Sequence, residues 1–291
     1  MNHPDQTSSI PFTKMQGSGN DFVVIVNDRL GLDPGVMPRW ARTLCRRSFG
    51  VGGDGLIFLE SRPASDQADV RWHFFNADGS RAEMCGNGSR CAAMLAFELN
   101  MAPASHVLET DAGPIRAEVK PEQGQVKVEL TQPHDLQLNL ELTLDHDHLQ
   151  VHFVDTGVPH AVLVTSDAAG TDMSRFGPGI RYHPRFSPRG ANVNLMEIRD
   201  RSSISIRTYE RGVEAETFAC GTGAVASALI GHELGLLDSR VDVQTSGGEE
   251  LRIFLDNSRV FLQGQAVLVY TGRLVPETFG LASPGDVSTI T

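Results

Sequence analysis

The sequence predicts an α/β (α+β) fold of two pseudo-symmetric domains, each a curved, mixed, largely antiparallel sheet wrapped around a central buried helix. The first observation is a repeated phrase, because Met84–Gly88 (MCGNG) and Ala219–Gly223 (ACGTG) both place a cysteine before Gly-x-Gly. Cys85 and Cys220 lie 220 − 85 = 135 residues apart. The other two observations are the long apolar run that follows each phrase and the many short strand patterns with few helices between them.

Two further pairs of segments repeat in the same order. Gly19–Val24 resembles Gly157–Val162, and Asp54 falls opposite Asn192, each at an offset of 192 − 54 = 138. Three pairs in one order with nearly one offset indicate an internal duplication. We therefore expect a first domain of residues 1–129 with 266–291, carrying Cys85, and a second domain of residues 130–265, carrying Cys220.

Short runs rich in β-branched and aromatic residues predict the strands. In the first domain they cover residues 22–26, 56–60, 70–76, 116–119 and 126–130. In the second domain they cover residues 152–154, 161–165, 193–199, 203–209, 241–244, 251–255 and 260–264. Few of these strands are separated by helices of crossover length, so we expect mostly antiparallel pairing.

The two clearest helices are Cys85–Leu99 and Cys220–Leu234. Both are apolar on nearly every side, and a helix without a polar face is a buried one. Asn100 and Gly235 suit the helix ends, because both residues accept the left-handed conformation found there. We expect the residues after Tyr270 to form a flexible terminus.

Composition excludes several classes of protein. Hydrophobic residues make up 40% of the 291 residues, and the net charge of −11 comes without a basic stripe, which argues against nucleic-acid binding. No apolar run is long enough to cross a bilayer. Met1–Ile10 lacks the regions of a signal peptide, so we expect a cytoplasmic location. The four cysteines are then expected to be reduced, with Cys45 and Cys91 as buried structural thiols.

The repeated phrase permits acid/base chemistry. A helix start presents unbonded backbone NH groups and the positive end of the helix dipole, which stabilise a thiolate and can lower a cysteine pKa to about 3.5–7.5. The NH groups of Gly86, Asn87, Gly221 and Thr222 could hold a carboxylate. If the two units face each other, one thiol could remove a proton from a carbon and the other could return one on the opposite side. The expected reaction is a racemisation or an epimerisation.

At these residues the chain resembles the diaminopimelate epimerase family over roughly Phe12–Arg273. The motifs that carry the resemblance are Lys14-Met15 with Gly19–Phe22, Phe75–Ser80, Cys85–Gly88, Tyr209–Gly212 and Cys220–Gly223. The resemblance implies interconversion of LL- and meso-diaminopimelate, for lysine and cell-wall synthesis, without a cofactor or a metal. The implied partners are a small amino-acid substrate and a second copy of the chain, in a homodimer.

The family's functional residues transfer to matching positions. Cys85 and Cys220 would be the acid/base pair, with Cys85 the proton donor and Cys220 the acceptor in one direction and the roles exchanged in reverse. His160 and Glu210 would orient or tune the thiols, and Tyr270 would serve the dimer. The substrate-binding residues would be Asn20, Asn76, Gly86, Asn87, Asn192, Glu210, Arg211, Gly221 and Thr222. Val158 and Gly55 depart from the family pattern, which weakens the inference on how the far end of the substrate is recognised.

Five alternative interpretations remain open or are disfavoured. A proline racemase-like enzyme would use the same paired thiols on a small ring, and a thiol redox protein would cycle Cys85 and Cys220 through a disulfide without the usual CxxC spacing. A non-catalytic amino-acid-binding module gives no reason for two matched thiols. The glycines of 50–55 match a dinucleotide fingerprint but follow a helix pattern and precede a strand, the reverse of the required order. His146, His148 and His152 alternate in a polar connection, where we expect solvent exposure rather than a metal site.

Overall fold

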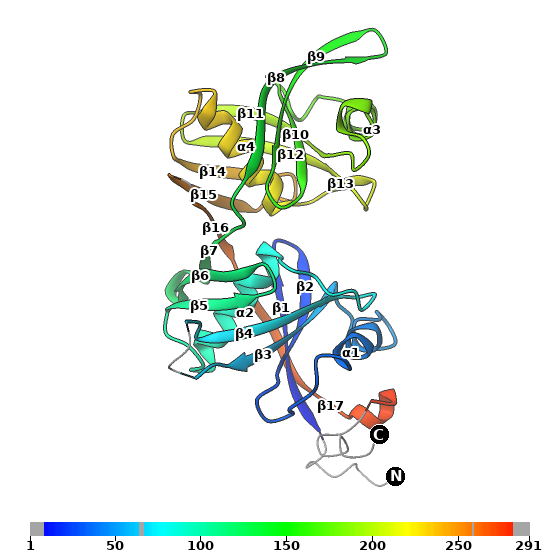
Figure 1. Cartoon of the computed structure of the whole chain (residues 1–291), viewed down its shortest axis with the longest axis vertical. Coiled ribbons are helices and arrows are strands. Elements are labelled where there is room, and N and C mark those ends of the chain that lie inside the picture. Colours follow the sequence, from blue (N-terminus) through cyan, green and yellow to red (C-terminus); the bar gives the residue numbers. More distant parts are fainter. Residues whose placement is uncertain (1–8, 64–66, 258, 282–291) are drawn as a thin grey trace. The chain divides into compact units, whose positions relative to one another are not determined.

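The computed structural model describes residues 9–63, 67–257 and 259–281, and these form two compact units (Figure 1). Unit 1 comprises Met1–Val128 and Gln265–Thr291, and unit 2 comprises Glu129–Gly264. The chain therefore leaves unit 1 once and returns to it for its last segment. The expected domain boundaries lie one residue later at each crossing.

Unit 1 is built on one sheet with two α-helices. Its strands are β1 (Ile10–Gly17), β2 (Asn20–Val26), β3 (Gly55–Ser61), β4 (Val70–Asn76), β5 (Ser105–Thr110), β6 (Gly113–Lys120), β7 (Gln125–Glu129) and β17 (Val267–Leu274). Its helices are α1 (Met37–Leu44) and α2 (Gly86–Glu98), with short 3-10 turns at Pro121–Gln123 and Pro276–Phe279. The strands pair in the order β17-β1-β2-β3-β4-β5-β6-β7.

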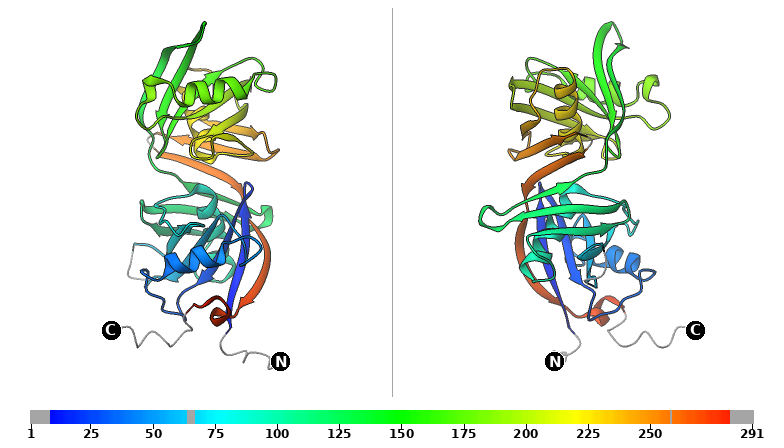
Figure 2. Two further views of the ribbon diagram at one scale, coloured as in Figure 1. Left: turned by 90° about the vertical axis from the view of Figure 1, so that its right-hand side faces the viewer. Right: turned by 60° about the vertical axis from the view of Figure 1, so that its left-hand side comes forward.

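Unit 2 repeats this plan. Its strands are β8 (His134–Leu144), β9 (Asp147–Asp155), β10 (Pro159–Val164), β11 (Asn192–Asp200), β12 (Ser203–Glu210), β13 (Ala215–Thr217), β14 (Arg240–Thr245), β15 (Glu250–Asp256) and β16 (Arg259–Gln265). Its helices are α3 (Met173–Arg181) and α4 (Gly221–Glu233), with a 3-10 turn at Pro184–Phe186. The main order is β8-β9-β10-β11-β12-β14-β15-β16, and the short β13 also pairs with β12. The β8–β9 hairpin extends beyond the rest of its sheet (Figure 2).

The two sheets share one pattern of strand directions. In unit 1 the parallel pairs are β2–β3 and β4–β5, and in unit 2 they are β10–β11 and β12–β14. Each of these pairs is joined by a crossover that carries one of the four α-helices, as parallel neighbours require. All other pairs of the two main orders are antiparallel. The shared pattern gives the duplication a structural basis.

A buried helix lies against each sheet. Helix α2 contacts strands β1 to β6 and β17, and α4 contacts β9 to β12, β14 and β15. Ten residues of α2 and eight of α4 are buried, which explains why neither sequence shows a polar stripe. The predicted fold class, a curved sheet around a central buried helix in each of two repeats, is confirmed.

The other two α-helices are shorter and also pack on the sheets: α1 contacts β3 and β4, and α3 contacts β11, β12 and β13. The apolar stripe of α1, with Trp40 and Leu44, packs against Val23 and Phe58 in an apolar cluster of unit 1. Pro38 stands at the start of α1, where its missing NH costs no hydrogen bond. Because both helices are short and half-exposed, their patterns are weaker than those of α2 and α4.

Several elements were not predicted from the sequence. They are β1, β5, β8, β13, β17 and α3. Strand β1 carries Pro11 and Lys14, and β8 is mostly exposed, so neither reads as an apolar run. Helix α3 contains Pro178.

The predicted flexible terminus after Tyr270 is wrong within the described residues. β17 continues to Leu274 in register with β1, and a 3-10 turn follows at Pro276–Phe279. The segment Ser283–Asp286 lies outside the described residues. Among the helices of the described ranges, none combines the length and the apolar character needed to span a membrane.

Candidate active site

Cys85 and Cys220 occupy the same position in their units, at the N-cap of a 13-residue helix. Their backbones are both extended, with φ and ψ of −153° and 113° at Cys85 and −128° and 107° at Cys220. Each carbonyl accepts the first intrahelical bond, from Ser89 at 2.8 Å and from Ala224 at 2.9 Å. The predicted helices begin one residue earlier than the observed ones, at the two N-cap cysteines themselves.

The NH groups at the two helix starts are oriented away from the helix body. The first NH groups of a helix have no intrahelical acceptor, and those of Gly86, Asn87, Gly221 and Thr222 belong to this set. Together with the helix dipole, these NH groups offer hydrogen-bond donors to an anion beside each cysteine.

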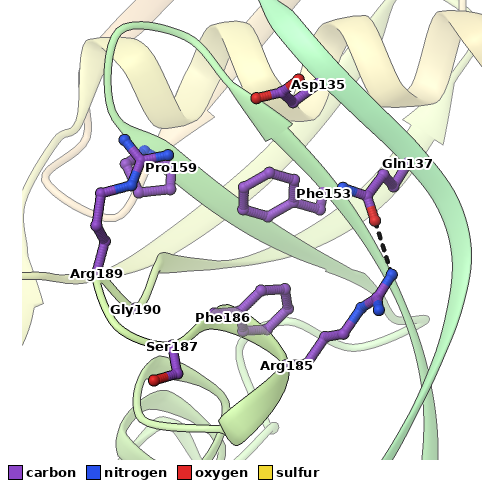
Figure 3. Close-up of a pocket in the computed structure, with 9 residues that line it drawn as sticks. All are labelled: Asp135, Gln137, Phe153, Pro159, Arg185, Phe186, Ser187, Arg189 and Gly190. Atoms are coloured by element: carbon purple, nitrogen blue, oxygen red, sulfur yellow. Dashed lines mark hydrogen bonds between the residues drawn. The ribbon is translucent and has the colours of Figure 1, made fainter.

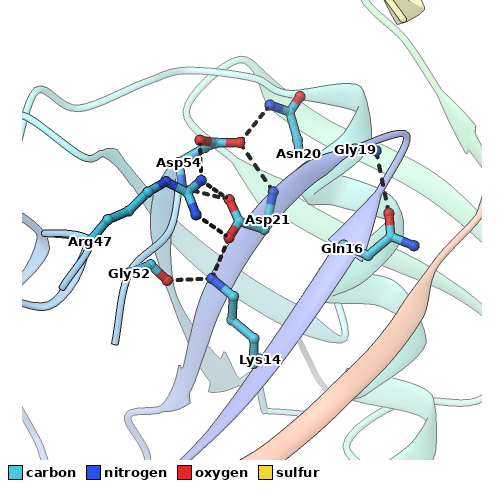
Figure 4. Close-up of polar contacts among 8 residues, drawn as sticks. All are labelled: Lys14, Gln16, Gly19, Asn20, Asp21, Arg47, Gly52 and Asp54. Carbon is cyan, nitrogen blue, oxygen red and sulfur yellow. Dashed lines mark hydrogen bonds and ion pairs between the residues drawn. The ribbon is translucent and has the colours of Figure 1, made fainter. Parts of the chain in front are cut away.

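A chain of side-chain amides supports the first helix start. Asp54 Oδ2 accepts a hydrogen bond from Asn20 Nδ2 at 3.0 Å (Figure 4). Asn20 Oδ1 in turn accepts one from Asn87 Nδ2 at 2.6 Å. Because a carboxylate only accepts, Asp54 determines which end of each amide donates. Asn87 Oδ1 is left buried, with no hydrogen-bond partner within the described residues.

An ion-pair cluster holds this chain in place (Figure 4). Asp21 lies 2.7 Å from Lys14 Nζ and 2.6 Å from Arg47 Nη2, and Arg47 Nη2 also lies 3.0 Å from Asp54 Oδ1. Burial raises the pKa of Asp21, but the hydrogen bonds and charges of Arg47 and Lys14 outweigh it and bring the pKa to about 2. Lys14 Nζ donates its second bond to the carbonyl of Gly52. The loop before β3 is thereby tied to β1 and β2.

Asn76 stands apart from this chain of amides. It ends β4, is exposed, and donates from Nδ2 to Ser80 Oγ at 2.9 Å across the turn Asn76–Ser80. Its amide is therefore oriented by the turn at the end of its own strand rather than by the helix start.

A second polar network surrounds Cys220. The Thr222 hydroxyl lies 3.4 Å from Cys220 Sγ and 3.0 Å from His160 Nε2. His160 is fully buried, and burial, with the nearby charge of Arg211, lowers its pKa to about 3. His160 is therefore neutral at physiological pH, and its hydrogen bond to Thr222 connects it to Cys220.

The predicted thiolate is wrong for Cys220 in this structure. Burial, together with the carboxylate of Glu210, raises the pKa of Cys220 to about 11, while the Thr222 hydroxyl and the NH groups of the helix start act in the opposite direction. Burial also raises the pKa of Glu210. The helix dipole alone is too weak to overcome full desolvation of the sulfur. Cys220 is a thiol here and suits a proton donor.

Asn192 binds its own unit rather than pointing outward. Its Oδ1 accepts from the backbone NH of Arg211 at 2.7 Å, and its Nδ2 donates to the carbonyl of Pro159 at 3.3 Å. It is 4% exposed, so one amide hydrogen at most remains for a ligand. The Arg211 guanidinium is partly buried and donates to the carbonyl of Arg189 at 3.4 Å, which leaves further NH groups for a carboxylate.

The two departures from the family pattern have different surroundings. A Cβ on Gly55 would lie 2.5 Å from Phe74 Cε2 and 2.9 Å from the carbonyl oxygen of Phe75, so no larger side chain fits there. Val158 is partly exposed in the turn before β10. Gly55 is thus set by packing inside unit 1.

The structure places the predicted residues in two groups. Unit 1 holds Asn20, Asn76, Cys85, Gly86, Asn87 and Tyr270, and unit 2 holds His160, Asn192, Glu210, Arg211, Cys220, Gly221 and Thr222. Tyr270 lies on β17, away from the helix start, and its ring packs edge-on against Phe12 with centroids 6.0 Å apart.

Sequence reasoning missed two residues that support the site. In the sequence, Asp54 has only a place opposite Asn192 in the repeat, and Asn194 lies within a predicted strand. Asn192 and Asn194 alternate along β11 and are both buried, and two polar residues at positions i and i+2 of a buried strand share one face. That alternation was the available signal.

A cavity of about 300 Å³ opens in unit 2 beside β8, β9 and the turn after α3 (Figure 3). It is lined by Asp135, Gln137, Phe153, Pro159, Arg185, Phe186, Ser187, Arg189 and Gly190. None of the predicted site residues lines it. Nearby, His152 is buried, contrary to the predicted exposure, and its Nδ1 accepts from the NH of Asn139 at 3.1 Å.

Comparisons with known proteins match most of this chain to one family. A family model described as diaminopimelate epimerase matches residues 12–135 and 152–272. A diaminopimelate epimerase from a Hydrogenobaculum species is 44% identical over 279 residues, covering 92% of this chain and 99% of the relative. One from Aquifex aeolicus is 43% identical over 275 residues, covering 91% and 98%.

Solved structures share the fold at low sequence identity. A PhzF-family phenazine biosynthesis protein from Bacillus anthracis superimposes with a TM-score of 0.67 at 17% identity, covering 91% of this chain and 99% of that one. A hydroxyproline epimerase from Agrobacterium vitis does so with a TM-score of 0.64 at 13% identity, covering 92% and 93%. At these identities the likeness concerns the fold alone.

Proposed function

Since the chain belongs to the diaminopimelate epimerase family, we propose that it interconverts LL- and meso-2,6-diaminopimelate with two cysteines as acid and base. The family makes the chain an isomerase, and its curated relatives carry the name of this reaction. The product would serve lysine and cell-wall synthesis.

The proposed reaction moves one proton off a carbon and another proton on. A thiolate removes the α-proton, the electron pair passes into the carboxylate as an enediolate, and the opposite thiol protonates the other face. One thiol and one thiolate remain at the end, so no oxidant, reductant or cofactor is consumed. The helix-start NH groups would stabilise the charge that develops on the carboxylate.

The observation that carries this proposal is the duplicated helix start. Two cysteines with the same extended backbone cap two helices of equal length, and each is followed by glycine. A redox pair or a single nucleophile has no need of such equivalence. Inversion of a stereocentre requires two proton carriers of the same kind, one for each face.

The protonation state of Cys220 indicates which cysteine donates a proton and which accepts one at the start of the cycle. Because its pKa is raised to about 11, Cys220 would enter the cycle as the proton donor. Cys85 would then accept the α-proton, and the roles would exchange in the reverse direction. Glu210 contributes by opposing negative charge on Cys220.

The remaining polar residues would recognise the amino and carboxyl groups. Arg211 has the planar fork that binds a carboxylate in a bidentate manner. Glu210 can accept from an ammonium group, and so can the buried, unpartnered Oδ1 of Asn87. Asn20, Asn76 and Asn192 would supply single hydrogen bonds around them.

The test is isotope exchange with cysteine variants. In deuterated water the wild type should incorporate one solvent deuterium at the inverted carbon. Cys85→Ala and Cys220→Ala should each abolish epimerisation, because inversion needs both thiols. Cys91→Ala is the matched control, since this thiol is buried inside α2 and has no proposed role. Full activity in either active-site variant would refute the two-thiol mechanism.

The same assay separates the alternatives. Turnover of proline without turnover of diaminopimelate would indicate a proline racemase-like enzyme. Activity that depends on a cycle of oxidation and reduction would indicate the redox protein, whereas the epimerase should be fully active in reductant. Within the described residues, none of Cys45, Cys85, Cys91 and Cys220 forms a disulfide.

A homodimer through β17 forms a second part of the proposal. In the described sheet β17 pairs with β1 on one side, and its Val267, Leu268, Val269 and Tyr270 are 36–52% exposed. An exposed apolar edge strand is a surface that a second chain can cover. Val269→Lys should shift the protein toward the monomer in analytical ultracentrifugation, and an unchanged dimer would contradict this assignment.

A further inference from the structure

We propose that Asn194 is a positioning residue for Cys220: it holds the His160 proton on Nε2 and thereby directs the Thr222 hydroxyl hydrogen at the sulfur. The inference rests on the proposed function, because it concerns how one of the two thiols is tuned. All of its residues lie within unit 2.

The orientation of the Asn194 amide is set from both ends. The Thr208 hydroxyl donates to Asn194 Oδ1 at 2.9 Å, and Asn194 Nδ2 lies 3.4 Å from the carbonyl oxygen of Ala161. A backbone carbonyl accepts only, so the NH₂ end must face Ala161. The same NH₂ group lies 3.0 Å from His160 Nδ1.

This contact determines the tautomer of His160. An amide NH₂ can only donate, so His160 Nδ1 must carry the lone pair. The ring is neutral, because burial keeps its pKa near 3. A neutral imidazole with a bare Nδ1 carries its hydrogen on Nε2, which faces Thr222 Oγ1 at 3.0 Å.

The tautomer in turn directs the hydroxyl. Thr222 Oγ1 accepts the hydrogen from His160 Nε2, so its own hydrogen is free to point at Cys220 Sγ, 3.4 Å away. A donor aimed at sulfur favours the thiolate over the thiol. This bond opposes burial and the charge of Glu210, the two influences that hold Cys220 protonated. With the opposite tautomer, the Thr222 hydroxyl would donate to His160 Nε2 instead, and the thiolate of Cys220 would lose this hydrogen bond.

The first turn of α4 packs closely against the side chain of Asn194. A Cβ added to Gly223 would lie 2.3 Å from Asn194 Oδ1 and 3.3 Å from Thr208 Oγ1. The glycine therefore allows the first turn of α4 to approach this amide. Asn192 Nδ2 also lies near His160 Nε2, at 3.5 Å, but its better-placed acceptor is the carbonyl of Pro159 at 3.3 Å.

The experiment measures the tautomer of His160 and the pKa of Cys220 independently of the enzymatic activity. ¹⁵N-histidine NMR of the full chain, with His160 assigned by comparison with His160→Gln, should show a neutral Nε2–H ring in the wild type. Asn194→Asp replaces the donor with an acceptor, so His160 should change to the Nδ1–H form or become protonated. Asn194→Leu removes the donor without adding charge and should give a mixture of tautomers.

The thiol is followed by the pH dependence of Cys220 alkylation in a Cys85→Ala background. In this background, Asn194→Leu should raise the apparent pKa of Cys220. In the chain that keeps both thiols, Asn194→Leu should lower kcat by about 10- to 100-fold with little change in KM. This is the loss expected for one hydrogen bond to a charged group. For the charge that Asn194→Asp adds in the tautomer measurement, the control is Asn139→Asp, an exposed change on β8.

Each outcome bears on one idea. A wild-type Nδ1–H ring, or a pure Nε2–H ring in Asn194→Leu, would overturn the role of Asn194 even if that variant were less stable. A wild type with the expected tautomer but no epimerase activity would overturn the proposed function instead, while the tautomer assignment would stand.

Discussion

Replacing His160 by glutamine should remove a defined part of the acid sensitivity of the fold. His160 is fully buried, and burial together with Arg211 lowers its pKa from 6.5 to about 3. The folded state therefore favours the neutral ring, while the unfolded chain binds a proton near pH 6.5. Its contribution to stability is complete above the unfolded pKa and is lost progressively as pH falls toward the folded pKa.

The magnitude follows from the two pKa values. One unit of difference corresponds to about 1.36 kcal/mol, so the full effect approaches about 5 kcal/mol at very low pH. Between pH 7 and pH 5 the folded state should lose about 2 kcal/mol through this ring alone. Glutamine keeps a donor and an acceptor but cannot titrate, so the variant should not show this loss.

Urea unfolding at pH 7 and pH 5 measures the effect in both proteins. Far-UV circular dichroism follows both units, whereas fluorescence reports on unit 1, because Trp40 and Trp72 both lie there. The loss of about 2 kcal/mol should therefore be seen by circular dichroism in the wild type and be absent from His160→Gln. Equal pH dependence in the two proteins would refute the assignment of a buried neutral ring to His160.

Three further predictions concern other contacts. Gly177→Ala should lower the free energy of unfolding by about 1–3 kcal/mol in urea titrations, because the new Cβ would lie 2.6 Å from Tyr209 Cδ2; an unchanged midpoint would mean that the ring moves aside. Lys14→Met should cost about 1.5–3 kcal/mol at pH 7 and raise the pKa of Asp21, which shifts acid unfolding to higher pH; equal acid midpoints would count against the ion pair. Asp54→Ala should raise KM by about 3- to 10-fold with little change in kcat, because the amide chain beside α2 loses its fixed acceptor; steady-state kinetics with an unchanged KM would contradict that role.

Local patterns predicted the repeat and both central helices. A capping position and an all-apolar helix are encoded within about four turns of chain, so Cys85 and Cys220 could be placed at helix starts from their neighbours alone. The apolar character of α2 and α4 also predicted their burial. These features need no knowledge of distant segments.

Strands that depend on distant partners were missed for a physical reason. β1 contains a buried lysine, and that lysine is tolerable only because Asp21 of β2 lies beside it. β17 is largely exposed, and its last four residues fall in the segment predicted to be flexible. It nevertheless pairs with β1 through backbone hydrogen bonds that side-chain composition does not reveal. Backbone pairing with a strand from the other end of the chain leaves little trace in local sequence.

The sequence by itself determined the duplication, the two buried helices and the placement of a thiol at the start of each, because these follow from local periodicity and from the residues around a helix cap. Only the tertiary structure decided the protonation of Cys220, since the depth of burial and the approach of Glu210 outweigh the helix dipole. It alone connected Asn194 to that thiol through His160 and Thr222. Desolvation and hydrogen-bond direction depend on which strands lie side by side, and that is a property of the folded chain.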